Sequence, residues 1–179
     1  IHGIIGDTVV QAQEARFAVE EGDFDLVLTF DYECLGTPID EIARKLRQEL
    51  LDHGVLNKEK SISIAAHSMG GLVSRYLVEN LLHDNGAIQQ LLLFGTPNGG
   101  SRFGTVPKAQ PLFISALAYG INFLPNQLKE IATSIGVFLG MVPDALKPQL
   151  FQTLEMMAVG SDFLTQLYDN PLPKNTRYH

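Results

Sequence analysis

The pattern of hydrophobic and polar positions divides the first hundred residues into alternating elements. Three short runs of β-branched and other apolar residues predict strands at 24–30, 61–67 and 88–94. Between them, apolar residues recur at helical spacing and predict helices at 39–51 and 72–82. The order strand, helix, strand, helix, strand is typical of a parallel sheet with helices on its faces.

Local signals mark the ends of these elements. Thr37 and Pro38 form the pair typical of an N-cap and a first helical position, and Gly54 is expected to end the same helix. Near the end of the chain, residues 176–178 resemble the start of another strand.

The segment 104–157 has a different pattern. Prolines interrupt its apolar stretches, no strand is indicated, and apolar residues at helical spacing predict two or three short helices. It is interpreted either as a helical insertion that packs on the sheet or as an apolar cap over a site, and these two interpretations are compatible.

Composition indicates one globular domain spanning residues 1–179. Hydrophobic residues make up 45% of the chain and charged residues only 18%, which favours a buried core over disorder. The net charge of −7, without runs of Lys or Arg, argues against a partner that is a nucleic acid. The longest apolar stretch, at 131–143, is too short to span a bilayer.

The cysteine and histidine content predicts no metal site and no cofactor. Cys34 is the single cysteine and is interpreted as a small buried hydrophobe. No Cys/His pair has zinc spacing, and no glycine-rich loop for a phosphate or dinucleotide follows a predicted strand. Because no disulfide or leader is visible, we expect a cytoplasmic location.

Ser68 is the strongest candidate for chemistry. It stands in the run Ala66-His67-Ser68-Met69-Gly70, which lies between a predicted strand and a predicted helix. A small residue two positions before the serine and another two after it allow a strained turn that exposes the hydroxyl oxygen. The alternative is an ordinary strand-to-helix turn that happens to contain a serine.

A serine nucleophile that attacks an ester needs two amide donors for the developing oxyanion. The helix that follows Ser68 supplies the amide of Met69. The second donor is expected from the loop that begins His2-Gly3-Ile4, with the amide of Ile4 as the candidate.

Together these motifs resemble the α/β-hydrolase superfamily, in particular its lipase and esterase branch. The resemblance rests on the runs that begin at His2 and Ala66, on Gly95-Thr96-Pro97-Asn98-Gly99-Gly100-Ser101, and on the closing region 160–178. Asn98 stands where many of these lipases have His. The resemblance implies an α/β fold: a three-layer α/β-hydrolase core with a parallel sheet and a helical cap at 104–157, truncated at both ends. Within this branch, the sequence is similar to small bacterial lipases and to lipases related to GPI inositol deacylases.

The superfamily's acid and base are expected after the nucleophile, in the order Ser, Asp or Glu, then His. His83 lies about 22 Å along the helix from Ser68 and is excluded, and the His67 side chain is expected to point away from the hydroxyl. His179 remains a possible base, with acids from the aspartates Asp144, Asp162 and Asp169. The preferred expectation is that acid and base lie beyond this chain, which alone would be almost inert.

The sequence thus predicts a serine hydrolase that cleaves carboxylic esters through an acyl-enzyme on Ser68. The apolar segment 104–157 favours a lipid or acyl ester as substrate and a transient contact of the cap with a membrane surface. Thioesterase and acyltransferase chemistry would use the same groups. The alternative from another class is a non-catalytic module of the same fold that binds a lipid or a protein.

Overall fold

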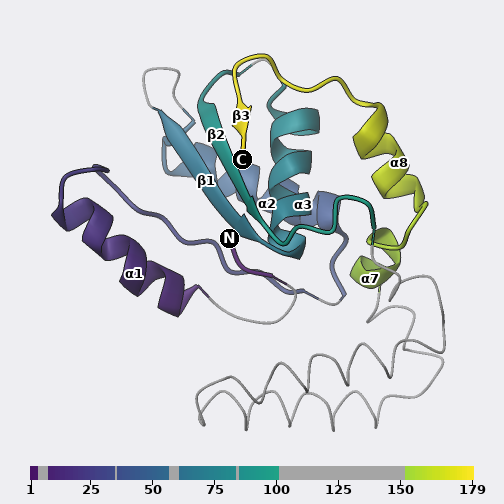
Figure 1. Ribbon diagram of the computed structural model, residues 1–179, viewed down its shortest axis with the longest axis horizontal. Coiled ribbons are helices and arrows are strands. Elements are labelled where there is room, and N and C mark those ends of the chain that lie inside the picture. Colours follow the sequence, from purple (N-terminus) through teal and green to yellow (C-terminus); the bar gives the residue numbers. More distant parts are fainter. Residues whose placement is uncertain (4–7, 35, 57–60, 84, 101–151) are drawn as a thin grey trace, which may run out of the picture.

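A parallel sheet forms the centre of the molecule in this computed structural model (Figure 1). The structure describes residues 1–3, 8–34, 36–56, 61–83, 85–100 and 152–179. The three strands of the sheet, in the order β1-β2-β3, are β1 (Ile62–His67), β2 (Ile88–Phe94) and β3 (Arg177–Tyr178). The parallel α/β arrangement expected from the sequence is therefore confirmed, and the two longer strands lie at the predicted positions.

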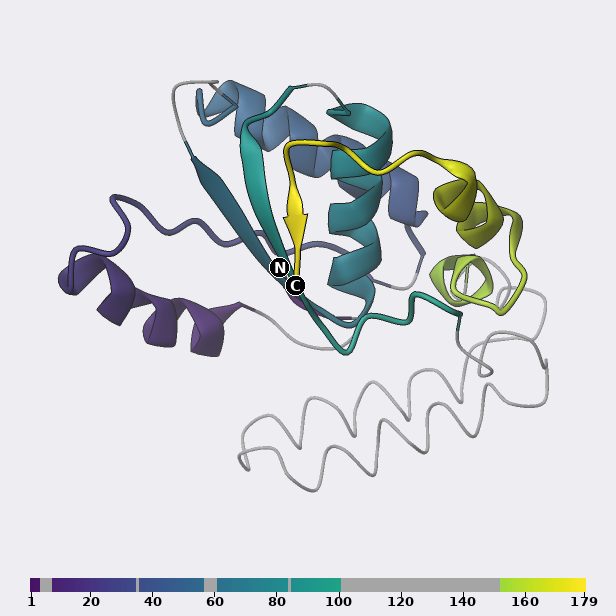
Figure 2. The ribbon, with the colours of Figure 1, turned by 45° about the horizontal axis from the view of Figure 1, so that its top comes forward.

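Backbone hydrogen bonds bring both ends of the chain to the sheet. The amino group of Ile1 donates to the carbonyl of Ala65, and the amide of His67 donates to the carbonyl of Ile1. At the other edge, the amide of Leu93 donates to the carbonyl of His179. The two termini therefore both lie near the carboxyl ends of the strands, at opposite edges of the described sheet, with β1 and β2 between them (Figure 2).

Helices α2 (Ile39–Asp52) and α3 (Met69–Tyr76) pack against each other, and α3 packs on one face of the sheet (Figures 1 and 2). Alternate residues of β1, Ile64 and Ala66, are buried, whereas Ala65 and His67 are exposed on the opposite face. Four residues at helical spacing are buried on α2: Ile39, Ile42, Ala43 and Leu46. The hydrophobic core therefore lies between the helices and one face of the sheet.

The ends of α2 agree only partly with their predicted signals. Pro38 occupies the N-cap position, one residue later than predicted for the cap. Thr37 does not cap the helix, because its hydroxyl donates to the carboxylate of Glu33. The C-terminal signal is confirmed, since Gly54 follows the last turn with a positive φ of 63°.

The helix after β1 is longer than predicted and changes its pitch. It begins at Met69, directly after Ser68, and continues from α3 into η1 (Leu77–Leu81), a π-helical stretch. π-helical turns inside helices are rare and are often found at functional sites.

The predicted strand at 24–30 is wrong. The segment forms no ladder with a neighbour in the described part of the chain, and Leu26 and Leu28 are more than half exposed. A β-strand requires backbone partners along its length, whereas the described hydrogen bonds to the N-terminal residues are made by Asp31 and Tyr32, just beyond this segment. The sequence pattern also did not indicate α1 (Val9–Glu20), which stands apart from the sheet in Figures 1 and 2.

Most of the predicted cap at 104–157, namely residues 104–151, lies outside the described residues. The structure describes its last part as α7 (Gln152–Met156), followed by α8 (Asp162–Asp169). The hydroxyl of Thr153 in α7 donates to the carbonyl of Cys34, which connects this region to the segment before α2. None of the described helices has the length and apolar character needed to cross a membrane.

Candidate functional site

Ser68 occupies the single residue between the end of β1 and the start of α3. Its backbone has φ 53° and ψ −124°, and in the described part of the chain it is the one non-glycine residue with a positive φ. Such a conformation costs a residue with a side chain about 1–3 kcal/mol, so the surrounding structure must impose it. The chain turns from β1 into α3 within this one residue, and so sharp a turn requires the positive φ.

Two backbone hydrogen bonds hold the Ser68 turn in place. Its amide donates to the carbonyl of Phe94 at the end of β2, over 2.8 Å, and its carbonyl accepts from the amide of Gly71, over 3.0 Å. The turn is thereby fixed both to the neighbouring strand and to the first turn of its own helix.

The segment Ile1–Gly3 and the loop after β2 press against this turn from two sides. A Cβ on Gly3 would lie 2.9 Å from the Cβ of Ser68 and 3.0 Å from Nδ1 of His67. A Cβ on Gly71 would collide with the side chain of Thr96. Both positions therefore require glycine in this structure.

Gly70 requires glycine for a reason that differs from the one expected. From the sequence, the small residues on either side of Ser68 are expected to be needed by the strained turn itself. In the structure, the atoms nearest to a Cβ on Gly70 belong to Ile1 and to the carbonyl of His2. The N-terminal segment, and not Ala66, thus limits the side chain at this position.

The predicted oxyanion donors are placed in part. Met69 is the first residue of α3, and amides in the first turn of a helix have no carbonyl partner within that helix. Ile4 lies outside the described residues, but its neighbour Gly3 touches the Ser68 turn.

The His2 side chain has a position that the sequence did not reveal. It is 2% exposed, its ring stacks on that of Tyr32 with centroids 4.2 Å apart, and Nδ1 lies 2.6 Å from the carbonyl oxygen of Gly3. Nε2 accepts the amide of Tyr32 over 3.2 Å, and the Tyr32 hydroxyl donates to the carbonyl of His2 over 2.6 Å. The His2 ring therefore clamps the backbone of Gly3, next to Ser68.

These contacts select the tautomer of His2. Nε2 also lies 3.6 Å from the carboxylate of Asp31, which would favour a proton on Nε2. The shorter contacts favour a proton on Nδ1, and Asp31 already accepts two hydrogen bonds from Thr8. With Nδ1 donating to Gly3 and Nε2 accepting from Tyr32, the ring has no free nitrogen with which to serve as a base for Ser68.

Cys34 lies beside this clamp as a half-buried free thiol. Its sulfur donates to the carbonyl of Tyr32 over 3.3 Å and lies 3.9 Å from Nδ1 of His2. Burial, together with the nearby carboxylates of Glu33 and Asp31, raises the pKa of the thiol from 9.0 to about 12. The protonated thiol behaves as the packing group that the sequence suggested, although it is only partly buried.

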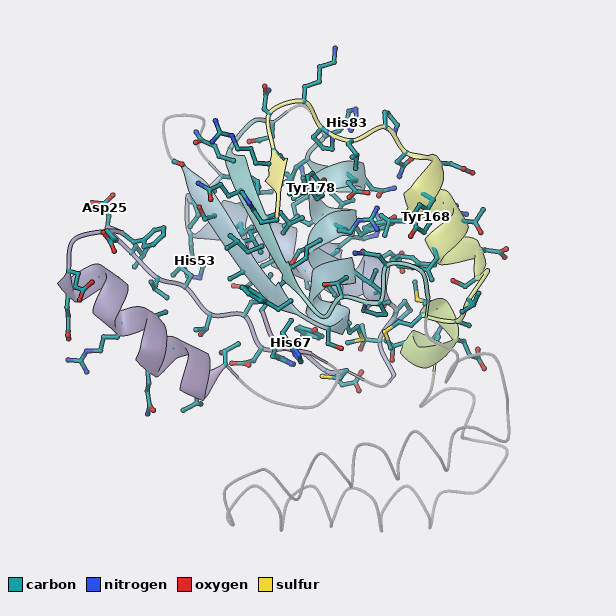
Figure 3. The ribbon with its side chains drawn as sticks, in the orientation of Figure 1. Asp25, His53, His67, His83, Tyr168 and Tyr178 are labelled. Carbon is teal, nitrogen blue, oxygen red and sulfur yellow. The ribbon has the colours of Figure 1, made fainter. Side chains whose placement is uncertain are left out.

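The structure separates the other histidines. Figure 3 shows His67 at the end of the sheet near Ser68 and His83 at the opposite end, so the exclusion of His83 agrees with the structure. His179 pairs with β2 between Leu91 and Leu93. Two strand spacings and about three residues of rise then place its Cα roughly 14 Å from that of Ser68. An imidazole does not reach the hydroxyl across that distance.

The candidate acids are not brought to the serine either. Asp162 and Asp169 lie in the first and last turns of α8 and are exposed, and Asp144 lies outside the described residues. In the part of the chain that the structure describes, no hydrogen bond joins a side chain to the Ser68 hydroxyl. A polar hollow of about 360 Å³ lined by Gln90 and Arg177 lies at the other end of the strands and is separate from this site.

Sequence reasoning also missed a buried ion pair between Arg75 and Glu79 on α3 and η1. A signal was present, because two opposite charges four residues apart interrupt an otherwise largely apolar helix at 72–82. An ion pair at that spacing is usually exposed, and only the burial of this one distinguishes it.

The sheet, the helices and the turn at Ser68 have the arrangement of an α/β-hydrolase fold. Across residues 1–179 the chain matches the family described as "Domain of unknown function (DUF7379)", and it belongs to that family.

Comparisons with characterised proteins support the same class. The chain is 27% identical to Triacylglycerol lipase 2 of Saccharomyces cerevisiae over 126 residues, which are 70% of this chain and 37% of the yeast protein. Its fold is similar to that of phospholipase PlaB from Legionella pneumophila, with a TM-score of 0.66 and 19% identity over 99% of this chain and 37% of PlaB.

PlaB in complex with thio-NAD gives a TM-score of 0.59 and 17% identity over 93% of this chain and 32% of PlaB. The chain therefore spans little more than a third of the length of the relatives it matches. The comparisons establish a similarity to lipases at the level of the fold.

Proposed function

We propose that this protein is a serine hydrolase that cleaves carboxylic esters, with lipid or acyl esters as substrates, through an acyl-enzyme on Ser68. The observation that carries the proposal is the strained backbone of Ser68, held between a strand and a helix and pressed by Gly3. The yeast and Legionella relatives, a triacylglycerol lipase and a phospholipase, support lipid esters as the substrate class.

The reaction begins when the hydroxyl oxygen of Ser68 attacks the carbonyl carbon of the ester. A base accepts the hydroxyl proton, and the oxyanion receives hydrogen bonds from the amides of Met69 and Ile4. Collapse of the tetrahedral intermediate breaks the bond to the alcohol, which leaves with the proton. Water then attacks the acyl-Ser68 ester and releases the carboxylic acid.

The acid and base of this reaction are not assigned among the described residues. Both ring nitrogens of His2 bond to backbone groups, and His179, which follows β3, lies too far from Ser68. Because removal of a catalytic histidine lowers kcat by about 10⁶, residues 1–179 alone are expected to be almost inert if the base comes from elsewhere in the natural protein.

A non-catalytic module of the same fold is the second candidate, and the lack of a described base favours it. The strain at Ser68 opposes it, because a binding module gains nothing from about 1–3 kcal/mol stored in a serine backbone. Glycine would adopt the same conformation without that cost.

Labelling with a fluorophosphonate probe separates the two candidates. The experiment uses this chain and the longest natural protein that contains it, each with the variants Ser68→Ala and Ser61→Ala. Ser61 is an exposed serine directly before β1, at the end of the strand away from Ser68, and serves as the matched control. Labelling of the longer protein that is lost in Ser68→Ala and kept in Ser61→Ala supports the hydrolase. No labelling of any folded protein would leave the binding module.

A further inference from the structure

A buried ion pair lies on the helix that follows Ser68. Arg75 Nε and Nη2 donate to the two carboxylate oxygens of Glu79 over 2.8 and 3.0 Å, and the two side chains are 9% and 0% exposed. A buried pair recovers its desolvation cost only with good geometry and further hydrogen bonds, and is by itself weak evidence for stability. The further partners of Arg75 and Glu79 therefore indicate the role of this ion pair.

Those partners come from three separate segments that surround α3. The remaining amino group of Arg75, Nη1, donates to Oδ1 of Asn98 in the loop after β2, over 3.0 Å. The hydroxyl of Tyr178 in β3 donates to Glu79 over 3.1 Å, and the Tyr168 ring of α8 lies 5.6 Å from the guanidinium carbon. Figure 3 shows Tyr178 next to α3 and Tyr168 on α8.

Each charged group thus has several partners. Burial and the neighbouring carboxylate of Glu79 raise the pKa of Tyr178, so this hydroxyl remains a donor at neutral pH. The guanidinium is held in one orientation by the two bonds to Glu79, which aims Nη1 at Asn98. A bidentate pair of this kind fixes direction as well as distance.

The loop that Asn98 anchors, residues 95–100, borders the Ser68 turn. It starts directly after Phe94, whose carbonyl accepts the Ser68 amide, and its Thr96 side chain fills the space beside Gly71. At its other end, a Cβ on Gly100 would lie 2.7 Å from the backbone of Val159. A shift of this loop therefore moves the groups that hold Ser68.

We propose that Arg75 is a positioning residue: held by Glu79, it fixes the 95–100 loop through Asn98 and so keeps the Ser68 turn in its reactive geometry. This inference rests on the proposed function of Ser68. Small displacements of a nucleophile have large effects on rate, and 1 Å costs about a hundredfold.

The test compares Asn98→Leu, which removes the acceptor at similar volume, with Asn98→Asp, which keeps an oxygen acceptor. Asn80→Leu, on the exposed side of η1, is the matched control. In the longest natural protein, we expect Asn98→Leu to lower the rate constant of fluorophosphonate labelling about tenfold. We expect Asn98→Asp and Asn80→Leu to label within twofold of the wild type.

A p-nitrophenyl ester separates positioning from binding. Asn98→Leu is expected to lower kcat with KM nearly unchanged, and the melting temperature is measured alongside. Arg75→Lys, which loses the fork geometry, should have an effect that does not add to that of Asn98→Leu, because the two act through one contact. Wild-type kinetics in a folded Asn98→Leu protein would overturn the inference.

Hydrogen exchange distinguishes failure of the inference from failure of the proposed function. If Ser68→Ala is still labelled, or the wild type is never labelled, the proposed function fails. The labelling and ester kinetics then no longer test the positioning role of Arg75. Exchange of the amides in 66–72 and 93–100 then decides: faster exchange in Asn98→Leu but not in Asn98→Asp supports the anchoring role of Arg75. Equal exchange in both variants overturns it.

Discussion

Gly3 lies directly against Ser68, with room for a hydrogen atom but not for a methyl group between them. A Cβ at Gly3 would stand 2.9 Å from the Cβ of Ser68. Gly3→Ala must therefore push the N-terminal segment away from the turn and, with it, the amide of the following residue. We expect the rate of fluorophosphonate labelling at Ser68 to fall about tenfold or more.

Gly99→Ala is the matched control for this variant. A Cβ at Gly99 meets no atom within 4 Å, and Gly99 has no positive φ. Gly99→Ala should label at the wild-type rate. Equal labelling of Gly3→Ala and Gly99→Ala would contradict the close packing of the N-terminal segment on the serine.

The strained backbone of Ser68 predicts that an inactive variant is more stable than the wild type. Ser68→Gly relieves about 1–3 kcal/mol of strain and costs about 0.5–1 kcal/mol through the flexibility of glycine in the unfolded chain. A net gain of about 1 kcal/mol corresponds to a rise in Tm of about 2–4 °C for a domain of this size.

Ser68→Ala keeps the strain and is the control. Both variants lose labelling, but in thermal unfolding only Ser68→Gly should melt above the wild type. If Ser68→Gly and Ser68→Ala have the same Tm, the positive φ at Ser68 carries no measurable strain.

Patterns local in the sequence predicted what depends on local structure. The alternation of buried and exposed residues in β1 and the helical spacing of buried residues in α2 each involve side chains that are close together in the sequence. The predicted strand at 24–30 failed because a strand also needs a neighbour along its length, which no local pattern provides.

The contacts that hold the candidate site could not be predicted in the same way. His2 meets Tyr32 across 30 positions, and Arg75 meets Asn98 across 23. A histidine next to a glycine, or an arginine in a helix, could form hydrogen bonds with many residues distant in the sequence. Only the folded structure determines which of them it meets. The sequence could predict that a turn between a strand and a helix lies at Ser68, whereas it could not predict the residues that hold this turn.

The thiol of Cys34 should be unusually unreactive. Burial and the carboxylates of Glu33 and Asp31 raise its pKa from 9.0 to about 12, so at pH 8 its thiolate fraction is about a thousandfold below that of a free thiol. Alkylation by iodoacetamide, followed by mass spectrometry in native buffer and in urea, checks this. A native rate that levels off near pH 9 would contradict it.

The same shift predicts a loss of stability at high pH. A group whose pKa is higher in the folded state contributes stability that is fully present below the unfolded value, here 9.0, and is lost as the pH rises towards about 12. Serine does not titrate in this range, so the unfolding free energy of the wild type should fall relative to that of Cys34→Ser over this interval. Parallel curves for the two proteins would rule out the shift.

His2 should position the segment beside Ser68 through its two ring nitrogens. His2→Phe keeps the stacking on Tyr32 but leaves the buried carbonyl of Gly3 and the amide of Tyr32 without their partner, at a cost of about 1–3 kcal/mol. Because Gly3 touches Ser68, the labelling rate should also fall, by about tenfold. His53→Phe, at an exposed histidine, is the matched control and should change neither quantity. A His2→Phe protein that loses stability but labels like the wild type would show that the clamp supports the fold and not the nucleophile.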